Sequence, residues 1–234
     1  MLKKLIKDFS QLDKKLNLNF KNKNLLVQAF VHRSYLNENP KFQLEHNERL
    51  EFLGDAVLEL AVTEYLFLKY KKPEGDLTSY RASVVKADIL GETAKELKLE
   101  DFLLLSKGET KETGKARLFI LANCFESLIG ALYLDQGFKK CKDFIQKNLL
   151  KKKLSKIIEK GLYRDAKSYF QEKAQETFRV TPIYRVLEEK GPDHAKQFVI
   201  GVFLKDEMLA KGRGLSKQEA ELEAAKNALK TKGW

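Results

Sequence analysis

The sequence contains few cysteines and prolines and no long apolar run. Among its 234 residues there are two cysteines, Cys124 and Cys141, and four prolines. Two isolated cysteines give neither a disulfide framework nor a metal-type spacing, and they fit a reducing cytoplasmic compartment. The opening residues, MLKKLIKD, lack the apolar run of a secretory signal, and no segment approaches about 18 uninterrupted apolar residues. We therefore expect a cytoplasmic protein without a transmembrane helix.

Several familiar catalytic patterns are also absent. There is no Gly-rich phosphate-binding loop, so neither hydrolysis of nucleoside triphosphates nor a nucleotide cofactor is expected. No Ser/His/Asp or Cys/His pattern indicates a side-chain nucleophile. His32 lies in the apolar-flanked stretch FVHRSYL, which is more typical of a packed histidine than of a catalyst.

Positive charge, in contrast, is abundant. Lysine and arginine outnumber aspartate and glutamate by 44 to 33, which gives a formal net charge of +11. This excess favours a polyanionic partner, either nucleic acid or an acidic membrane surface. Charge alone is equally compatible with a basic protein that has no special partner.

Helical periodicity dominates residues 1–150, which we predict to form an all-α domain. Apolar residues recur at helical spacing, most clearly in the long segment 48–68. The sequence KPEGD at 72–76 interrupts the pattern. Further helices are predicted over residues 24–31, 77–85, 87–97 and 118–134.

The pattern changes after residue 150. The stretch 138–160 carries nine lysines against two acids, and we predict a basic helix that runs into a linker, residues 151–162. Residues 163–234 then alternate between helical and strand-like segments, which predicts a small α+β domain of order α-β-β-β-α. Its helices are expected over 165–177 and 217–230, and its strands over 183–188, 197–204 and 207–213.

Three acids in the segment HNERLEFLGDAVL (46–58) stand on one face of the long predicted helix. Glu48, Glu51 and Asp55 are spaced i, i+3 and i+7, so neighbours lie about one turn apart. Stacked carboxylates repel one another unless a cation lies among them, and Gly54 beside them permits a close approach. Because Mg²⁺ prefers hard oxygen ligands, these acids are candidate metal ligands.

A second helix, predicted within FILANCFESLIGALYL (119–134), is almost entirely apolar and should be buried. Its polar residues Asn123 and Glu126 share one face at i, i+3. A carboxylate on a buried helix is costly unless it is paired or binds a metal. If the two helices pack together, one or two Mg²⁺ ions would find four ligands: Glu51, Asp55, Asn123 and Glu126. Two such ions about 4 Å apart can activate water and stabilise the leaving oxygen in phosphodiester hydrolysis.

Spacing alone leaves a simpler interpretation open. Glu48 could pair with Arg49 or a nearby lysine, and Glu126 could bond Arg33 or Arg81. Surface acids at i, i+3 are common, and exposed charges of this kind contribute little.

The segment ERLEFLGDAVL (48–58) resembles the signature stretch of the ribonuclease III family. Supporting stretches agree with this resemblance: HRS at 32–34, EGDLT at 74–78 with Arg81, and FESLIGA at 125–131. The C-terminal α-β-β-β-α unit is similar to a double-stranded-RNA-binding domain, so the resemblance covers nearly the whole chain. It implies an all-α endonuclease domain (1–150) followed by a small α+β RNA-binding domain (163–234).

The resemblance also implies roles for individual acids. Asp55 and Glu126 match the pair usually called catalytic, and Glu51 joins them among the metal-binding acids. Glu48 matches an acid near the dimer and substrate surface, and Glu74 matches one near RNA.

The activity implied by the resemblance is Mg²⁺-dependent hydrolysis of double-stranded RNA by a homodimer, in which each catalytic domain cuts one strand. The products would carry 5′-phosphate and 3′-hydroxyl ends with a two-nucleotide 3′ overhang, and the expected targets are rRNA, mRNA and other precursor RNAs. No membrane partner is expected. The apolar faces around Phe52 and Leu53 are candidate dimer surfaces.

Duplex RNA is recognised largely by shape, through 2′-hydroxyls and phosphates over about 16 base pairs. Three regions match the contact surfaces of double-stranded-RNA-binding domains: the first helix, the loop after the first strand and the start of the last helix. The corresponding residues are Lys167, Gln171, Glu172, Gln175, His194, Ser216, Lys217 and Gln218.

Two positions depart from the family pattern. Asn123 stands where many bacterial members have aspartate; its amide oxygen can ligate Mg²⁺ but brings no charge, so we expect weaker metal affinity or another preferred ion such as Mn²⁺. Gln218 replaces a basic residue of many relatives, which should weaken RNA binding. Two other functions stay open: a protein that binds duplex RNA without cutting it, and a basic ribosome-associated structural protein with incidental acids.

Overall fold

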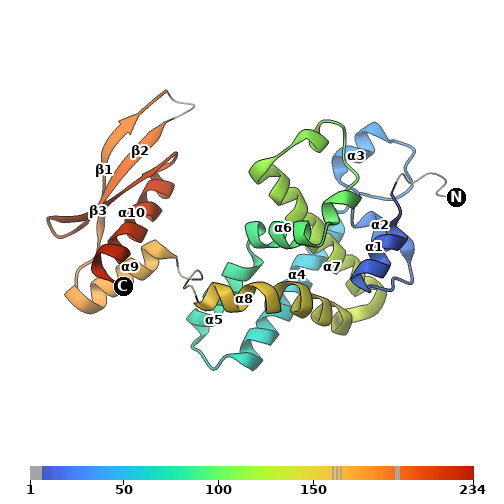
Figure 1. Cartoon of the computed structure of the whole chain (residues 1–234), viewed down its shortest axis with the longest axis horizontal. Coiled ribbons are helices and arrows are strands. Elements are labelled where there is room, and N and C mark those ends of the chain that lie inside the picture. Colours follow the sequence, from blue (N-terminus) through green and yellow to red (C-terminus); the bar gives the residue numbers. More distant parts are fainter. Residues whose placement is uncertain (1–6, 160, 162, 164, 193–195) are drawn as a thin grey trace. The chain divides into compact units, whose positions relative to one another are not determined.

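The structure is a computed structural model that describes residues 7–159, 161, 163, 165–192 and 196–234 (Figure 1). The chain divides into two compact units, one extending to residue 163 and the other beginning at residue 164. The first unit is helical, and the second combines helices with a three-stranded sheet. This is the fold class that the sequence predicts.

The first unit is built around its two longest helices, α4 (Glu48–Lys69) and α7 (Gly114–Ile145), which pack against each other. Smaller helices surround this pair: α1 (Phe9–Leu16), α2 (Lys23–Gln28), α3 (Arg33–Glu38), α5 (Glu74–Val85), α6 (Ala87–Glu96) and α8 (Lys151–Glu159). Three short turns complete the unit: η1 (Leu99–Phe102), η2 (Glu109–Lys111) and the π-helical η3 (Gln146–Leu150).

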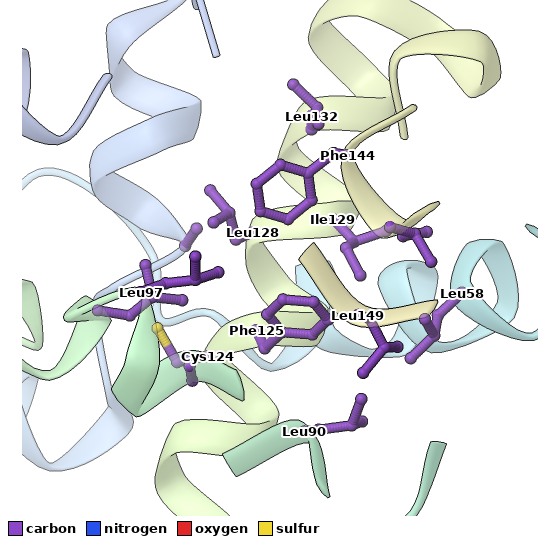
Figure 2. Close-up of a cluster of buried hydrophobic side chains, with 14 of the residues drawn as sticks. Leu58, Leu90, Leu97, Cys124, Phe125, Leu128, Ile129, Leu132, Phe144 and Leu149 are labelled. Atoms are coloured by element: carbon purple, nitrogen blue, oxygen red, sulfur yellow. The ribbon is translucent and has the colours of Figure 1, made fainter. Parts of the chain in front are cut away.

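Large apolar side chains from several helices fill the core of the first unit (Figure 2). Phe125, Leu128 and Ile129 of α7 lie at its centre and are fully buried. They meet Leu58 from α4 and Leu90 from α6, among others. Burying each such side chain contributes roughly 1.5–3 kcal/mol, so α7 is the element around which the unit is organised.

Helix α7 and its continuation are apolar enough to pass a membrane-span test by length and composition, with a mean hydropathy of 1.5 over 18 residues. However, 56% of that window is buried inside the structure. Packing in the core therefore accounts for the apolar character of this helix.

Residues 151–162 were predicted as the end of a basic helix that runs into a linker; the helix is confirmed, but it is packed into the first unit. Residues 151–159 form α8, and Leu154 and Ile157 are buried in the core of the first unit. The helix also packs against α5. The physical reason is a narrow apolar face: leucine and isoleucine recur at i, i+3 and i+4 between the lysines, which is enough to anchor a short helix.

The second unit is an antiparallel sheet of order β1-β2-β3 with two helices packed against it. Its elements follow the predicted order: α9 (Ala166–Phe178), β1 (Ile183–Lys190), β2 (Gln197–Leu204), β3 (Glu207–Gly214) and α10 (Lys217–Lys232). Phe170 of α9, Val202 of β2 and Ala224 of α10 are fully buried in a separate small core.

Small residues allow α10 to lie directly on β3. A methyl group on Gly212 would overlap the backbone of Ala220 and Ala224. One on Gly214 would lie 2.6 Å from the backbone nitrogen of Ala220. The sheet and the helix therefore touch through their main chains, and this contact fixes where α10 begins.

Both cysteines lie inside the first unit as free thiols. Burial raises the pKa of the Cys124 thiol far above its usual range. Burial also raises the pKa of Cys141 to about 12. These values agree with a packing role for both residues.

Candidate active site and nucleic-acid interface

The candidate site lies where α4 crosses α7, and two glycines make that crossing close. A methyl group on Gly54 would overlap the carbonyl oxygen of Glu126. A methyl group on Gly130 would overlap the carbonyl oxygen of Leu50. The two main chains are therefore in direct contact at one level of the bundle. Because Gly54 lies next to Asp55, the contact sets the acids of α4 against those of α7.

The four predicted ligands surround this crossing with different degrees of burial. Glu51 and Glu126 are partly buried, whereas Asp55 and Asn123 are exposed. Helical spacing accounts for this arrangement, since Glu51 and Asp55 are one turn apart on α4, as are Asn123 and Glu126 on α7. The packing that the sequence analysis made conditional is therefore present.

The acids at the crossing perturb one another. Burial, together with the negative charges of Asp55, Glu51 and Glu59, raises the pKa of Glu126 to about 8. Burial, together with Glu48 and Asp55, also raises the pKa of Glu51. Shifts in this direction are expected when carboxylates share a poorly solvated region. They show that Glu51, Asp55, Glu59 and Glu126 belong to one electrostatic cluster.

The arginines that might have neutralised Glu126 are used elsewhere. Arg33 lies 3.6 Å from Glu48, and the Nε of Arg81 lies 2.8 Å from Glu59. Among the residues that the structure describes, no cation forms an ion pair with Glu126. The alternative in which this acid is paired with Arg33 or Arg81 is therefore not what the fold shows. Glu48 is also 3.7 Å from His46, so it contacts Arg33 and His46 at the edge of the cluster, next to Glu51.

Glu59 is a member of the cluster that the sequence analysis missed. It follows Asp55 by four residues and therefore continues the face of Glu51 and Asp55 along α4. Its ion pair with Arg81 is completed by Thr63, whose hydroxyl accepts a hydrogen bond from Arg81 at 3.0 Å. The i+4 spacing was a usable signal, but the partner on α5 could not be read from it.

The residues at the crossing fit a bound divalent cation. Glu126 is partly buried without a neutralising neighbour, and the donors around it are carboxylate and amide oxygens, which suit Mg²⁺. Within the described ranges, no three carboxylate, imidazole or thiol groups already converge closely enough to enclose a metal. Like charges repel one another when no cation lies between them, which agrees with that spread.

Glu74 lies apart from this cluster, at the start of α5. Its carboxylate accepts a hydrogen bond from the Thr78 hydroxyl at 2.9 Å. It also lines an open groove together with Lys72, Phe67 and Arg81. The groove is adjacent to the cluster through Arg81, which pairs with Glu59. Glu74 is thus placed on a surface beside the candidate site and not among its ligands.

In the second unit, the predicted RNA-contact residues of α9 fall into two groups. Gln171, Glu172 and Gln175 are exposed and line one shallow hollow. Lys167 instead points inward: its ammonium group lies 2.6 Å from Glu221 and 4.9 Å from the ring centre of Tyr184. That lysine connects α9 to α10 and β1, so its positive charge is partly neutralised within the domain.

The start of α10 presents the other predicted contacts. Ser216 caps the helix by accepting a hydrogen bond from the Glu219 backbone N–H at 3.1 Å. Lys217 and Gln218 are exposed in the first turn, where free N–H groups favour phosphate. His194 lies outside the described residues.

Comparison with known proteins agrees with this architecture. The family model described as ribonuclease-III-like matches residues 22–153, and the model described as double-stranded RNA binding motif matches residues 166–232. Ribonuclease 3 of Protochlamydia amoebophila is 44% identical over 226 residues, which cover 96% of this chain and 92% of the relative. Ribonuclease 3 of Oceanobacillus iheyensis is 45% identical over 95% of this chain and 97% of its own.

Solved structures of a related nuclease domain are also similar. One structure of the nuclease domain of ribonuclease III from Campylobacter jejuni has a TM-score of 0.56 at 40% identity, covering 63% of this chain and 97% of its own. Another, described as showing structural flexibility in a region involved in dimer formation, has a TM-score of 0.54 at 42% identity, covering 60% and 98%.

Proposed function

Because this chain belongs to the ribonuclease III family, we propose that it is an Mg²⁺-dependent endonuclease that hydrolyses double-stranded RNA as a homodimer. The products are short duplexes with 5′-phosphate and 3′-hydroxyl ends and a two-nucleotide 3′ overhang. The substrates are duplex regions of rRNA, mRNA and other precursor RNAs in the cytoplasm. The family membership carries the RNA endonuclease class, and the residues of this chain support the finer statements.

The single observation that carries the proposal is the state of Glu126. A partly buried carboxylate beside three other acids, without a described cation next to it, is unfavourable in the absence of a ligand. A divalent cation removes the repulsion and holds Glu126 ionised at neutral pH. The same cation supplies Lewis-acid stabilisation and activates water for hydrolysis of a phosphodiester.

The chain's own residues then have distinct tasks. Asp55 and Glu126 are the catalytic acids that hold the ion at the crossing, with Glu51 and the Asn123 amide oxygen as further ligands. The Gly54 and Gly130 contact keeps these oxygens at a fixed separation, since neither helix can slide without main-chain overlap. Arg81 holds Glu59 in an ion pair, which limits the negative charge that reaches Glu126.

The second unit delivers duplex RNA to that site. The exposed polar residues of α9 suit the 2′-hydroxyls of a minor groove, and the first turn of α10 suits phosphates. His194 and the loop around it contact a second minor groove in this proposal. Because recognition is mostly by shape, the domain selects duplex RNA over single strands and over DNA.

The proposed homodimer is supported by an aromatic side chain in an unusual position. Phe52 is 83% exposed on α4, although large aromatic residues are normally buried. It stands beside a cavity of about 670 Å³ whose walls include Leu25, Leu53 and Leu134. A two-fold axis places the Phe52 of each copy against the cavity of the other, so that one patch serves both sides.

Cleavage of a labelled RNA duplex tests the enzyme directly. We expect discrete short duplexes from the wild type in Mg²⁺ and none in EDTA. Glu126→Ala should give no such products with Mg²⁺ or Mn²⁺. Glu45→Ala is a matched control, because Glu45 is an exposed acid that pairs only with the neighbouring Arg49 among the described residues. Because Glu45 also lines the cavity beside Phe52, Asp143→Ala is a second control at an exposed acid outside that cavity, and its products should equal those of the wild type.

Duplex binding without a cut at any Mg²⁺ or Mn²⁺ concentration would contradict the nuclease and support the RNA-binding alternative. Asn123 is the observation that favours this alternative, because it removes one charge from the ligand set. Equal binding of duplex RNA, single strands and DNA would instead support the structural-protein alternative.

A further inference from the structure

The cavity beside Phe52 owes its shape to a hydrogen-bonded clamp between the start of α2 and the middle of α7. We propose that Asp135 is a positioning residue for self-association: it fixes α2 against α7 and so keeps open the cavity that receives Phe52 of a second copy. This inference rests on the proposed homodimer and names the residue that prepares its surface.

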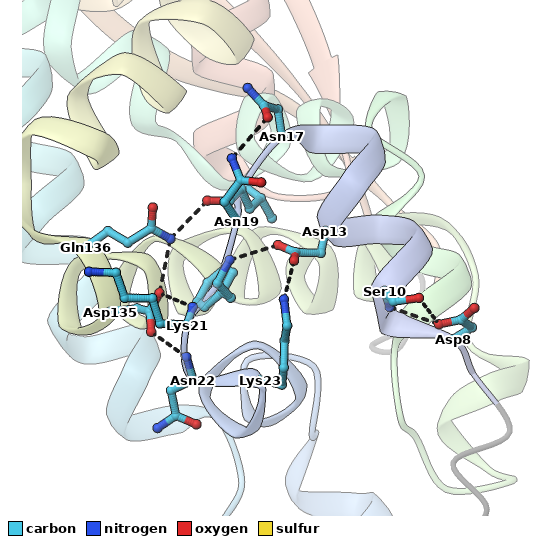
Figure 3. A network of polar contacts seen from close by, with 12 residues as sticks. Asp8, Ser10, Asp13, Asn17, Asn19, Lys21, Asn22, Lys23, Asp135 and Gln136 are labelled. Carbon is cyan, nitrogen blue, oxygen red and sulfur yellow. Dashed lines mark hydrogen bonds and ion pairs between the residues drawn. The ribbon is translucent and has the colours of Figure 1, made fainter.

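The clamp is made by two adjacent side chains of α7 (Figure 3). The carboxylate of Asp135 accepts the backbone N–H of Lys21 at one oxygen and that of Asn22 at the other, both at 2.8 Å. The amide of Gln136 donates to the carbonyl of Leu18 at 2.9 Å and to Asp135 at 3.1 Å. Three points of the segment that leads into α2 are therefore held by one turn of α7.

The opposite side of the same segment is held by α1. Asp13 accepts the backbone N–H of Phe20 at 3.1 Å and lies 2.5 Å from the ammonium group of Lys23 (Figure 3). Lys140, farther along α7, donates to the carbonyl of Asn17 at 2.9 Å. Residues 17–22 thus lie between α1 and α7, and on the α7 side their partner Asp135 follows Leu134, which lines the cavity.

Sequence neighbours connect the clamp to the cavity. Leu134, the residue before Asp135, is 55% exposed and forms one wall. Leu25 and Gln28 of α2 form another wall, and Leu50 and Leu53 of α4 contribute the floor beside Phe52. The bonds from Asp135 to Lys21 and Asn22, directly before α2, add to the packing of Leu26 and Val27 in setting the wall from α2 against the wall from α7.

The clamp suits a positioning role better than a role in global stability. Its bonds are made at the surface, away from the core cluster around Phe125. Burial alone would raise the pKa of Asp135, but the N–H groups of Asn22 and Lys21 and the Gln136 amide outweigh it and hold that pKa below its usual range. The carboxylate is therefore ionised at neutral pH, and hydrogen bonds to it are of the stronger, charge-assisted type.

A second copy of this chain is the occupant that fits best. Four leucines line the cavity beside polar and charged side chains, and the exposed Phe52 belongs to the same lining. A protrusion and a recess side by side are self-complementary under two-fold symmetry, so that two copies bury two aromatic rings at once. An unrelated protein would satisfy the recess but would leave Phe52 of this chain exposed.

Sedimentation of the full chain over a dilution series tests the clamp. Asp135→Asn replaces one anionic acceptor by an amide, and we expect the dimer Kd to rise at least fivefold. Asp143→Asn is the matched control: it removes the same charge from the segment of α7 that follows the break at Gly137, where Asp143 pairs only with Lys139 among the described residues. Its Kd should stay within about twofold of the wild type, as is usual for exposed pairs.

A double-mutant cycle with Phe52→Ala separates positioning from a general loss of stability. If the clamp acts through the cavity that receives Phe52, Asp135→Asn should not weaken a dimer that already lacks this side chain. Amide hydrogen exchange should also accelerate at Lys21 and Asn22 in Asp135→Asn and not in Asp143→Asn. Gln136→Ala, which leaves the carboxylate in place, should raise the Kd to a smaller extent and serves if Asp135→Asn folds poorly.

The outcomes are distinct. An unchanged Kd for Asp135→Asn, or effects of Asp135→Asn and Phe52→Ala that simply add, would overturn the clamp and leave the homodimer standing. A wild type that is monomeric at every concentration would overturn both. Duplex cleavage, measured in the same samples, reports on the proposed enzyme independently of either result.

Discussion

The two units use the same device, a helix pressed against another main chain at glycines, with different consequences. In the first unit, the Gly54 and Gly130 contact lies among the acids of the candidate site. In the second unit, Gly212 and Gly214 seat α10 on β3, and the exposed residues Gln171, Glu172 and Gln175, which are matched to RNA contact, lie on α9 outside that contact.

The difference shows how each unit should respond to change. At the helix crossing, the chemistry depends on the separation of a few oxygens, so a shift of about 1 Å is expected to cost roughly 100-fold in rate. On the RNA-binding unit, affinity is a sum of exposed contacts with phosphate and sugar, so each change is expected to act in a small and nearly independent way. We therefore expect larger effects from substitutions at the helix crossing than from substitutions in the RNA-binding unit.

The largest effect is expected from Gly54→Ala. The added methyl group overlaps the carbonyl of Glu126, so α4 and α7 must move apart. We expect the unfolding free energy of the first unit to fall by about 3 kcal/mol, as in an overpacked core, and cleavage to fall by more than about 100-fold. Denaturant unfolding and single-turnover cleavage measure the two changes.

Two other glycine variants serve as comparisons for Gly54→Ala. Gly75→Ala adds the same methyl group at a helical position with nothing within 4 Å, and it should be neutral or slightly stabilising. Gly212→Ala should weaken duplex binding yet leave cleavage at saturating RNA near the wild-type rate. If Gly212→Ala slowed saturated cleavage as much as Gly54→Ala, the contrast between the units would not hold.

The next effect concerns pH. Because the pKa of Glu126 is raised from about 4.5 to about 8, the metal-free fold binds a proton there that a divalent cation must displace. We expect Mn²⁺ affinity, measured by calorimetry, to rise by roughly tenfold per pH unit up to about pH 8 and then level off. Glu126→Gln should abolish this slope.

The same group gives a stability prediction of definite sign. A carboxyl whose pKa is raised on folding favours the folded state below its unfolded pKa, and that stability is lost as pH rises towards the folded pKa. The metal-free protein should therefore lose stability between about pH 4.5 and pH 8, and Glu126→Gln should remove this loss. If the stability of the wild type rose across this interval, and Glu126→Gln showed the same rise, the acid would not be held protonated.

A smaller change is expected from Asn123→Asp. The substitution adds a charge to an exposed ligand of the crossing, which should lower the Mg²⁺ concentration needed for half-maximal cleavage by several-fold. Titration of Mg²⁺ in a cleavage assay measures it. An unchanged or increased requirement would remove Asn123 from the proposed ligand set.

The smallest effect belongs to the RNA-binding unit. Gln218→Lys adds one cation to the exposed first turn of α10, so the slope of log affinity against log salt should become steeper by about one unit. Lys230→Gln, at the other end of the helix, should leave the slope unchanged. Filter binding of a duplex at several salt concentrations distinguishes the two, and equal changes would mean that α10 does not meet RNA at its start.

Most of the fold was predictable because its long elements carry a clear period. The predicted helix 48–68 ends one residue before α4 does, and the predicted strand 197–204 coincides with β2. The predicted helix 24–31 ends earlier, as α2, because Val31 leaves the helix to pair with Leu104. Helices α1 and α3, of eight and six residues, were not predicted because they are short, whereas α8 falls within the basic helix predicted in 138–160.

The residues of the candidate site could be predicted from the sequence, but the ion pairs and hydrogen bonds around it could not. Spacing showed which acids share a face, and the apolar surroundings of Glu126 indicated that it would be buried. The partners of Arg33, Arg81 and Lys167 depend on how helices cross, which no periodicity records. For the same reason, the bond between Asp135 and the start of α2, which are more than 100 positions apart, had no local signal.

The two buried thiols make the native chain behave chemically as if it had no cysteine. Since their pKa values are raised and their side chains are enclosed, neither supplies a thiolate to a maleimide or an oxidant while the fold is closed. A single cysteine introduced at an exposed position would therefore carry a fluorophore or a cross-linker at one known place, with no native residue to remove. The rate at which Cys124 is slowly alkylated would, in turn, measure how often the core around α7 opens.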